Sequence, residues 1–241
     1  MTKVVISQPM YFPWAGFMAQ ISLADILIWL DDVQFSKGSF TNRVQVKLEN
    51  GSKWMSIPLK GKGSFQQISE LEAIDNKWIL QHRGMLQQSL SEQPFINETL
   101  SIFDSIPNND LLINTLIASV EEPAKKLSIL PKKIIRSSDM NIEGSSWQRV
   151  LKLVETVGGD EYITGHGAFR YMNHEAFEEK EVRVSYMDYD VRPWPQAHGT
   201  FSPYVSILDL IAATSSSVAQ KYLNPSTIDW RKFVAQKESD S

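Results

Sequence analysis

The chain has 241 residues and a net charge of −4, with 42% hydrophobic and 22% charged residues, the composition of an ordinary soluble globular protein. This balance argues against the nucleic-acid backbone as the main partner, because no basic excess is available. The absence of cysteine excludes disulfides, thiol catalysis and cysteine metal sites.

The length and the order of the sequence patterns predict a single α/β domain over residues 1–241. We expect a Rossmann-like parallel or mixed sheet with a β-hairpin, a helical insert at about 75–130 and a polar C-terminal tail at about 232–241. The first apolar run lasts only three residues before it meets Gln8 and Pro9, so we expect no secretory signal. No window approaches about eighteen uninterrupted apolar residues, and we therefore expect a cytoplasmic protein without membrane insertion.

Residues 3–50 predict a strand, a loop, a helix and a second strand. Residues 4–6 are β-branched and apolar, as in a buried strand, and the run ends before Pro9, which cannot donate to a sheet ladder. A loop rich in aromatic residues and a stretch of helical spacing at 17–25 separate it from a second apolar strand at 26–30.

Polar residues follow both of these strands. Ligands of open parallel sheets bind outside the carboxyl ends of the strands, so these residues predict a site. The alternative is that the neighbouring aromatic residues fill the core and that Asp32 caps a turn. The residues concerned are Gln8 after the first strand, Asp31, Asp32 and Gln34 after the second, and Asn42 and Arg43 further on.

A β-hairpin is predicted next, from the alternating residues 43–48, the turn at Asn50-Gly51 and the returning run at 53–59. The loop at 61–64 reads Gly-Lys-Gly-Ser, which raises the question of phosphate binding. It lacks the spacing of a Walker loop and does not clearly open a helix, so we do not favour that role.

Residues 75–130 predict mainly helices, and Trp78 and His82 lie one turn apart on an apolar stripe. By default, His82 is a histidine at the edge of the core. A strand at 132–136 follows, and then a serine pair that ends at Ser138. The serine hydroxyls either bind a phosphate or carboxylate or cap the following turn, which is their commoner use.

A second concentration of polar residues follows the strand predicted at 160–164. Glycines on both sides of His166 let the backbone approach a ligand, and Arg170 supplies a planar fork for phosphate or carboxylate. A helix is expected at 173–180, so the N–H groups of this loop could face an anion. We favour a site here over the alternative, a βα turn with a surface histidine.

The last predicted strand spans residues 182–189, and a proline-broken loop at 190–204 follows it. The aromatic and amide side chains of this loop suit sugar stacking and hydroxyl recognition, or they simply pack as a lid. A helix is expected at 206–213.

The chemistry open to these residues is limited. The four histidines show no metal-ligand spacing. Asp31 and Asp32 would be the ligands of Mg²⁺, but neighbours on a strand point to opposite faces unless the strand has turned. Without cysteine or a G-x-S-x-G motif, general acid–base chemistry remains, and the predicted catalytic residues are Asp31, Asp32 and His166.

Several motifs resemble the WbqC-like family of bacterial proteins. The resemblance is dense over residues 3–58, through QPMYFPWAGF, AD and LDDVQFSKGSFTNR, and continues more thinly at 162–171 and 196–209. It implies a role in O-antigen or other surface-polysaccharide biosynthesis. Members of the family have been proposed to transfer glycine to an amino sugar.

The resemblance leads us to expect an aminoacyl transferase whose small-molecule partner is a nucleotide-linked amino sugar. We expect no cofactor, with Mg²⁺ and ATP as alternatives, and the sequence leaves a homodimer open. The predicted substrate-binding residues are Gln8, Tyr11, Trp14, Gln34, Asn42, Arg43, His82, Ser138, Gly165, Arg170, Tyr171, Gln196 and Phe201.

The opening of the chain also looks like that of HIGH-type nucleotidyltransferases and pantothenate synthetases. Those proteins have H-x-G-H where Trp14 and Phe17 stand in this sequence. The phosphate contacts of the two histidines are therefore missing, which counts against one alternative, an ATP-dependent amide ligase. The other alternative is a non-catalytic module that binds a sugar nucleotide.

Overall fold

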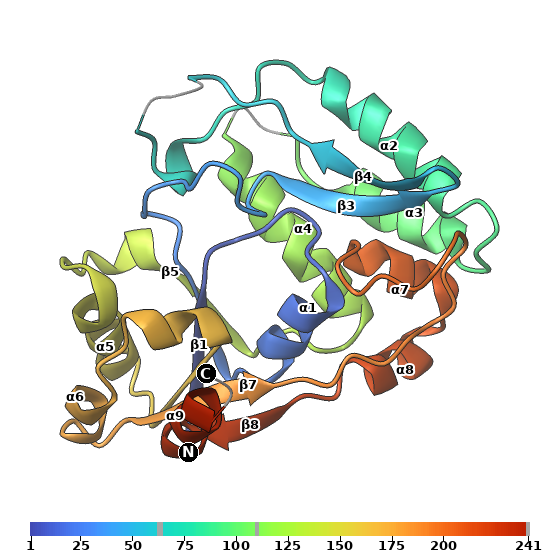
Figure 1. The fold of residues 1–241 in the computed structure, drawn as a ribbon. Coiled ribbons are helices and arrows are strands. Elements are labelled where there is room, and N and C mark those ends of the chain that lie inside the picture. The colour runs from blue at the N-terminus through green and yellow to red at the C-terminus, as the bar shows by residue number, and fades with distance from the viewer. Residues whose placement is uncertain (62–64, 109–110, 240–241) are drawn as a thin grey trace.

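The computed structural model describes residues 1–61, 65–108 and 111–239. Within them, six strands form a sheet in the order β5-β2-β1-β6-β7-β8, and all neighbours are parallel except β7 and β8 (Figure 1). The predicted Rossmann-like α/β fold with a mainly parallel sheet is confirmed. The strands are β1 (Lys3–Ser7), β2 (Ile26–Trp29), β5 (Lys133–Arg136), β6 (Glu161–Thr164), β7 (Arg183–Asp188) and β8 (Ser226–Asp229).

The chain starts in the middle of the sheet and fills it in two directions. From β1 it proceeds to β2 and β5 on one side, and it then returns to place β6 and β7 on the other side. The boundary between β1 and β6 is therefore the point at which the strand order reverses. In open α/β sheets, ligands bind at such a point, outside the carboxyl ends of the strands.

The two faces of the sheet are covered by different helices, because successive side chains of a strand point to opposite faces. Val5 belongs to the larger hydrophobic cluster, whereas Val4 and Ile6 belong to the smaller one. The larger cluster includes side chains of α1 (Ala15–Ser22), α2 (Lys77–Ser89), α3 (Ile96–Ser105), α4 (Leu112–Lys126), α7 (Ile207–Ala213) and α8 (Ser216–Ala219). The smaller cluster includes side chains of α5 (Ser146–Thr156), α6 (His174–Glu178) and α9 (Trp230–Ser239).

Short 3₁₀ helices connect several of these elements. Two of them directly follow strands of the sheet, so they lie at its carboxyl edge. They are η2 (Ser137–Met140) after β5 and η3 (His166–Arg170) after β6, and the others are η1 (Ile68–Glu70) and η4 (Gln220–Tyr222).

The predicted hairpin is present outside the main sheet. It consists of β3 (Arg43–Leu48) and β4 (Gly51–Ser56), and Figure 1 shows it beside the helices of the insert. Gly51 has φ +99°, a conformation that glycine adopts without strain, so β4 begins directly at this residue. The Gly-Lys-Gly-Ser loop predicted at 61–64 falls largely outside the described residues.

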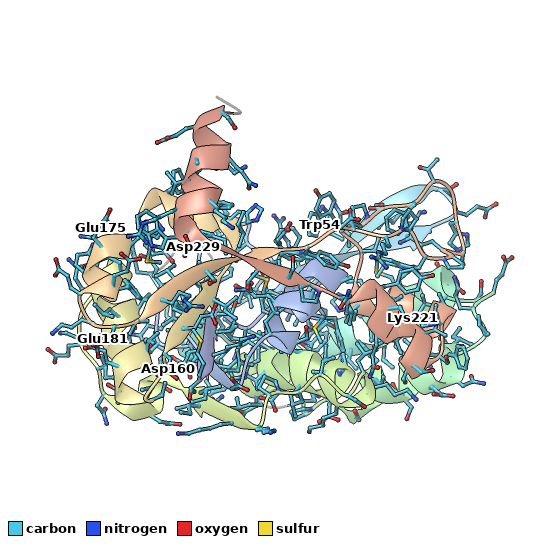
Figure 2. All side chains as sticks on the ribbon, turned by 90° about the horizontal axis from the view of Figure 1, so that it is seen from below. Trp54, Asp160, Glu175, Glu181, Lys221 and Asp229 are labelled. Atoms are coloured by element: carbon cyan, nitrogen blue, oxygen red, sulfur yellow. The ribbon has the colours of Figure 1, made fainter. Side chains whose placement is uncertain are left out.

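The C-terminal part differs from the prediction in two ways. The strand predicted to be the last is followed by β8, and most of the tail predicted at 232–241 belongs to helix α9, which projects beyond Asp229 (Figure 2). The helix forms because Asp229 Oδ1 accepts a hydrogen bond from Arg231 N at 2.9 Å, and because Trp230 and Phe233 are buried. None of the helices in the described ranges is long and apolar enough to span a membrane.

Candidate functional site

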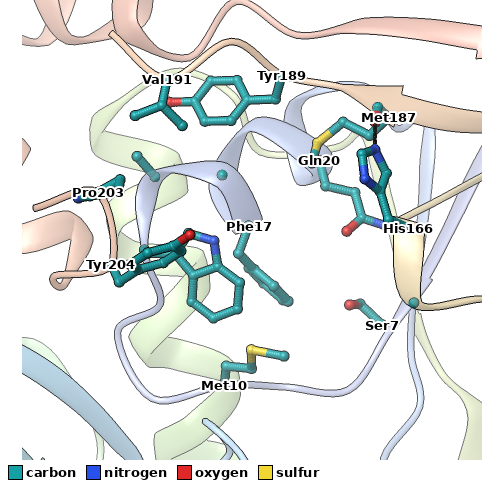
Figure 3. A pocket seen from close by; sticks show the side chains of 15 residues that line it. Ser7, Met10, Phe17, Gln20, His166, Met187, Tyr189, Val191, Pro203 and Tyr204 are labelled. Atoms are coloured by element: carbon teal, nitrogen blue, oxygen red, sulfur yellow. Dashed lines mark hydrogen bonds between the residues drawn. The ribbon is translucent and has the colours of Figure 1, made fainter. Parts of the chain in front are cut away.

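A cavity of about 700 Å³ opens at the carboxyl ends of β1, β6 and β7, where the strand order reverses (Figure 3). We call it the His166 cavity. Its walls come from the β1–α1 loop, α1, the β6–η3 connection, the end of β7 and the segment before α7. The lining residues are Ser7, Met10, Trp14, Ala15, Gly16, Phe17, Gln20, Gly165, His166, Gly167, Met187, Tyr189, Val191, Pro203 and Tyr204.

Most of this lining is apolar or aromatic, and the polar groups gather on one side. Figure 3 shows Phe17 and Tyr204 on one side and Ser7, Gln20 and His166 on the other. Within the described residues, the Ser7 hydroxyl and the Gln20 amide have no hydrogen-bond partner in the protein. These two groups are therefore free to bind a ligand.

The orientation of His166 is defined by two neighbours. Its Nε2 lies 2.9 Å from the carbonyl oxygen of Met187, and its ring packs at 4.8 Å from the ring of Phe233. A carbonyl oxygen only accepts hydrogen bonds, so Nε2 carries the proton. In the neutral imidazole, Nδ1 then holds the lone pair that can accept a proton from a ligand.

Gly16 allows the rings of Trp14 and Tyr189 to lie close to the backbone of helix α1. A Cβ atom on Gly16 would lie 3.0 Å from Trp14 Nε1 and 3.3 Å from Cδ1 of Tyr189. A larger residue would displace at least one of these two rings. The W-A-G-F motif thus places a flat aromatic surface at the start of α1.

A second cavity of about 580 Å³ lies at the carboxyl ends of β1 and β2, against the N-terminus of α5. We call it the Asp32 cavity. Most of its polar lining residues were predicted to form the site, but they are separated from His166. The lining residues are Gln8, Leu30, Asp32, Val33, Gln34, Gly144, Ser145, Ser146, Arg149, Val150, Leu153 and Tyr171.

An ion pair with Arg149 holds the Asp32 carboxylate in place. Ser137 Oγ lies 2.6 Å from the other carboxylate oxygen. Burial raises the pKa of Asp32, but the hydrogen bonds from Arg149 and Ser137 outweigh it, and the pKa lies below its ordinary value. Asp32 is therefore ionised at neutral pH and is a weak base.

Asp31 has a different environment and lines neither cavity. It is buried and accepts hydrogen bonds from Ser138 N at 3.1 Å and from Ser138 Oγ at 2.8 Å, with Arg136 Nε at 3.7 Å. Asp31 and Ser138 therefore join the end of β2 to the connection after β5. In the described part of the chain, no group of three histidine, aspartate or glutamate side chains is arranged to hold a metal ion.

Tyr11 and His82, both predicted to bind substrate, lie in the protein interior. The Tyr11 hydroxyl lies 3.0 Å from His82 Nδ1, and both side chains are buried beside Trp78. Burial raises the pKa of Tyr11 well above its usual value and lowers the pKa of His82 to about 4. The neutral phenol therefore donates to a neutral imidazole, and the pair connects the aromatic loop to α2.

The remaining predicted residues line neither cavity. Asn42 Nδ2 donates to Ile57 O at 2.8 Å, and the guanidinium of Arg43 lies 4.3 Å from the ring of Trp54. Gln196 Oε1 accepts from Lys47 Nζ at 2.9 Å. Two further residues complete this set, Phe201, whose ring packs against Trp194, and Arg170, which is exposed on η3.

Of the residues predicted to bind substrate, Trp14 and Gly165 lie in the His166 cavity. Gln20, Ser7 and Tyr189 of the same cavity were not predicted. Gln20 carried a signal, because it is a polar residue in an otherwise apolar run from 15 to 21. Nothing in the sequence distinguished Tyr189, because a single aromatic residue after a strand does not by itself indicate a binding site.

Comparison with known proteins shows a match to one protein family and to one relative of similar length. The sequence model of the WbqC-like protein family matches residues 8–221, which include most of both cavities but not β8 or α9. A protein of Mycobacterium tuberculosis named "Uncharacterized protein Rv1507c" is 30% identical over 219 residues, which cover 88% of this chain and 93% of that protein. No solved structure matches the chain.

Proposed function

The chain belongs to the WbqC-like protein family. We propose that it is an enzyme that transfers an aminoacyl group, such as glycyl, to the amine of a nucleotide-linked amino sugar. The observation that carries this proposal is the presence of two cavities along one carboxyl edge of the sheet. A transferase binds two substrates, and two adjoining sites with different linings suit that requirement.

The two cavities share their dividing walls. Consecutive residues of the β1–α1 connection line different cavities, Ser7 the first and Gln8 the second. Likewise, His166 at the start of η3 lines the first and Tyr171, which directly follows η3, lines the second. Ligands in the two cavities would therefore lie on either side of the same two segments.

The His166 cavity suits the amino-sugar nucleotide. Its volume of about 700 Å³ lies within the range of small-molecule sites, roughly 300–1,000 Å³. The rings of Trp14, Phe17 and Tyr204 offer faces for the apolar side of a sugar or for a base. The hydroxyl of Ser7 and the amide of Gln20 can bind sugar hydroxyls.

In the proposed reaction, the amine nitrogen attacks the carbonyl carbon of an activated acyl ester. The new C–N bond forms and Nδ1 of His166 accepts the proton that the amine loses. The imidazolium then gives this proton to the alkoxide oxygen as the C–O bond breaks, so that the leaving group departs as a neutral alcohol. The developing oxyanion needs hydrogen-bond donors, which Gln20, Ser7 and the backbone N–H groups near Gly165 can supply.

The Asp32 cavity suits the aminoacyl donor. The carboxylate of Asp32 and the amides of Gln8 and Gln34 can bind hydroxyl groups of the alcohol part of this donor, while its acyl carbonyl extends past Ser7 into the His166 cavity, where the amine attacks it.

The test of this proposal is an assay of acyl transfer to nucleotide-linked amino sugars, with products detected by mass spectrometry. His166→Asn should lower turnover by about 100-fold or more, which is the usual contribution of a general base, while the affinity for the nucleotide sugar changes little. Asp190→Asn, at an exposed position outside both cavities, is the matched control and should retain wild-type turnover. Full activity of the His166 variant would disprove the proposed base.

A second candidate function is a non-catalytic sugar-nucleotide-binding module. It is favoured by the contacts of Asp31 and Asp32, because both predicted carboxylate bases are already engaged by serine or arginine side chains. Saturable binding of the nucleotide sugar without turnover for any acyl donor would support the module. Ligand at a hundredfold over Kd should stabilise the protein by about 2.7 kcal/mol, which a thermal shift detects.

A further inference from the structure

The C-terminal segment contributes to the surroundings of His166 although it lies outside the family match. That match ends at residue 221, whereas β8 and α9 begin at Ser226 and Trp230. The His166 ring nevertheless packs against Phe233 of α9, with ring centroids 4.8 Å apart.

Helix α9 is firmly attached to the rest of the molecule through α6. The ring of Trp230 stacks on His174 with centroids 4.5 Å apart and an angle of 8° between the planes. Glu178 accepts hydrogen bonds from Trp230 Nε1 at 2.9 Å and from Arg231 Nη2 at 2.6 Å. The first turn of α9 is therefore held at several points.

Phe233 lies one turn further along α9 and contacts the rings of Tyr186, Phe169 and His166. It stacks on Tyr186 of β7 with centroids 3.9 Å apart, and its ring is tilted by 55° against His166. The side chain is only 3% exposed. Phe233 is thus fixed by its own packing before it touches the imidazole.

We infer that Phe233 is a positioning residue that orients the imidazole of His166 for proton transfer. This inference rests on the proposed role of His166 as the base. The hydrogen bond to Met187 O restrains one nitrogen, but His166 itself is exposed, and a single bond leaves the ring free to swing away. Contact with a fixed aromatic ring removes that freedom, so Nδ1 stays directed away from Met187 and available to a ligand.

The experiment compares Phe233→Leu with Phe103→Leu in the full chain. Phe103 is the matched control, because it is also buried and stacked, on Phe12 at 5.8 Å, but belongs to α3 in the other hydrophobic cluster. Nitrogen-15 NMR of labelled histidine reports the tautomer of each ring, and His166→Asn assigns the signals. No substrate is needed for this measurement.

The wild type and Phe103→Leu should show His166 as the single Nε2–H tautomer. Phe233→Leu should show a mixture of tautomers, and its kcat should fall by about tenfold while KM stays the same. Should Phe233→Leu fold poorly, Phe233→Met keeps the apolar volume without the flat ring and serves in its place.

Two results would overturn the inference. One is an unchanged His166 spectrum in the Phe233 variants, and the other is an equal change in Phe103→Leu, which would mean a global loss of packing. The proposed function fails separately, if His166→Asn remains fully active. In that case the tautomer change in Phe233→Leu would still show that Phe233 orients the ring.

Discussion

Asp209 in α7 has a carboxylate that is almost completely buried and only half satisfied. Oδ1 accepts a hydrogen bond from Trp194 Nε1 at 2.6 Å, whereas Oδ2 has no partner within the described residues. Burial raises the pKa of Asp209 to about 6, and the contacts with Trp194 and the charge of Lys47 offset this only in part. The segment before α7, which supplies Tyr204 to the His166 cavity, is anchored by this bond.

The raised pKa predicts how stability changes with pH. The folded state holds a proton on Asp209 up to about pH 6, whereas the unfolded chain releases it near pH 4, so this group makes folding less favourable as pH rises between those values. From pH 4 to 7, the free energy of unfolding of the wild type should fall by about 2 kcal/mol relative to Asp209→Asn.

Denaturant unfolding at several pH values measures this difference. Asn keeps an oxygen for Trp194 and removes the titration, while Asp190→Asn changes an exposed carboxylate and should follow the wild type. A difference between wild type and Asp209→Asn that does not vary with pH would show that Asp209 titrates normally.

A substitution of Tyr11 tests whether this residue stabilises the protein interior or binds a ligand. Tyr11→Phe removes the donor to His82 Nδ1 and leaves a buried acceptor unpaired, which should cost about 1–2 kcal/mol of unfolding free energy. Ligand affinity should remain unchanged.

Tyr204→Ala should have the opposite effect, because this exposed residue lines the His166 cavity. The affinity for the ligand should fall, and the free energy of unfolding should be retained. A loss of affinity in Tyr11→Phe without a loss of stability would place its hydroxyl at the ligand.

At the scale of elements, the turn between α5 and β6 packs against the central strand β1 through a glycine. A Cβ on Gly159 would lie 2.5 Å from Cγ2 of Val4 and 2.8 Å from Cγ1 of Val154. Gly159→Ala should therefore destabilise the protein by about 1–3 kcal/mol through overpacking.

The neighbouring Gly158 provides the control for this prediction. Its φ is +70° and a Cβ there would meet nothing within 4 Å, so Gly158→Ala costs only backbone strain, about 1 kcal/mol. Thermal or denaturant unfolding compares the two variants. Equal losses would mean that α5 and β1 can move apart without cost.

Element patterns explain which parts of the fold could be predicted. The run of strand, helix and strand at the N-terminus and the hairpin are long and periodic, so local pattern and tertiary structure agree. β8 has four residues, and α9 carries mainly polar and charged side chains around its two buried aromatic residues. Their structure depends on contacts with β7 and α6, which the sequence pattern does not contain.

At the scale of the whole molecule, the residues predicted from the sequence to form a site include several that line cavities at the carboxyl edge of the sheet, but the sequence did not predict two separate cavities. Gln8, Asp32, Gln34 and Tyr171 lie in one cavity, and Trp14, Gly165 and His166 lie in the other. The division arises because the connections after β1 and β6 leave the sheet in opposite directions, a property of topology. The aromatic loop was open to two interpretations, and both apply, since Trp14 lines a cavity while Tyr11 is buried.

The single peptide that joins Ser7 to Gln8 forms part of the wall between the two cavities. Pro9 follows directly and is buried, so this peptide has little local freedom to relax when it is displaced. A ligand that shifts it from one side alters the shape presented to the other side. The two binding equilibria are then linked. If the first ligand changes the affinity for the second by some factor, the second ligand changes the affinity for the first by the same factor.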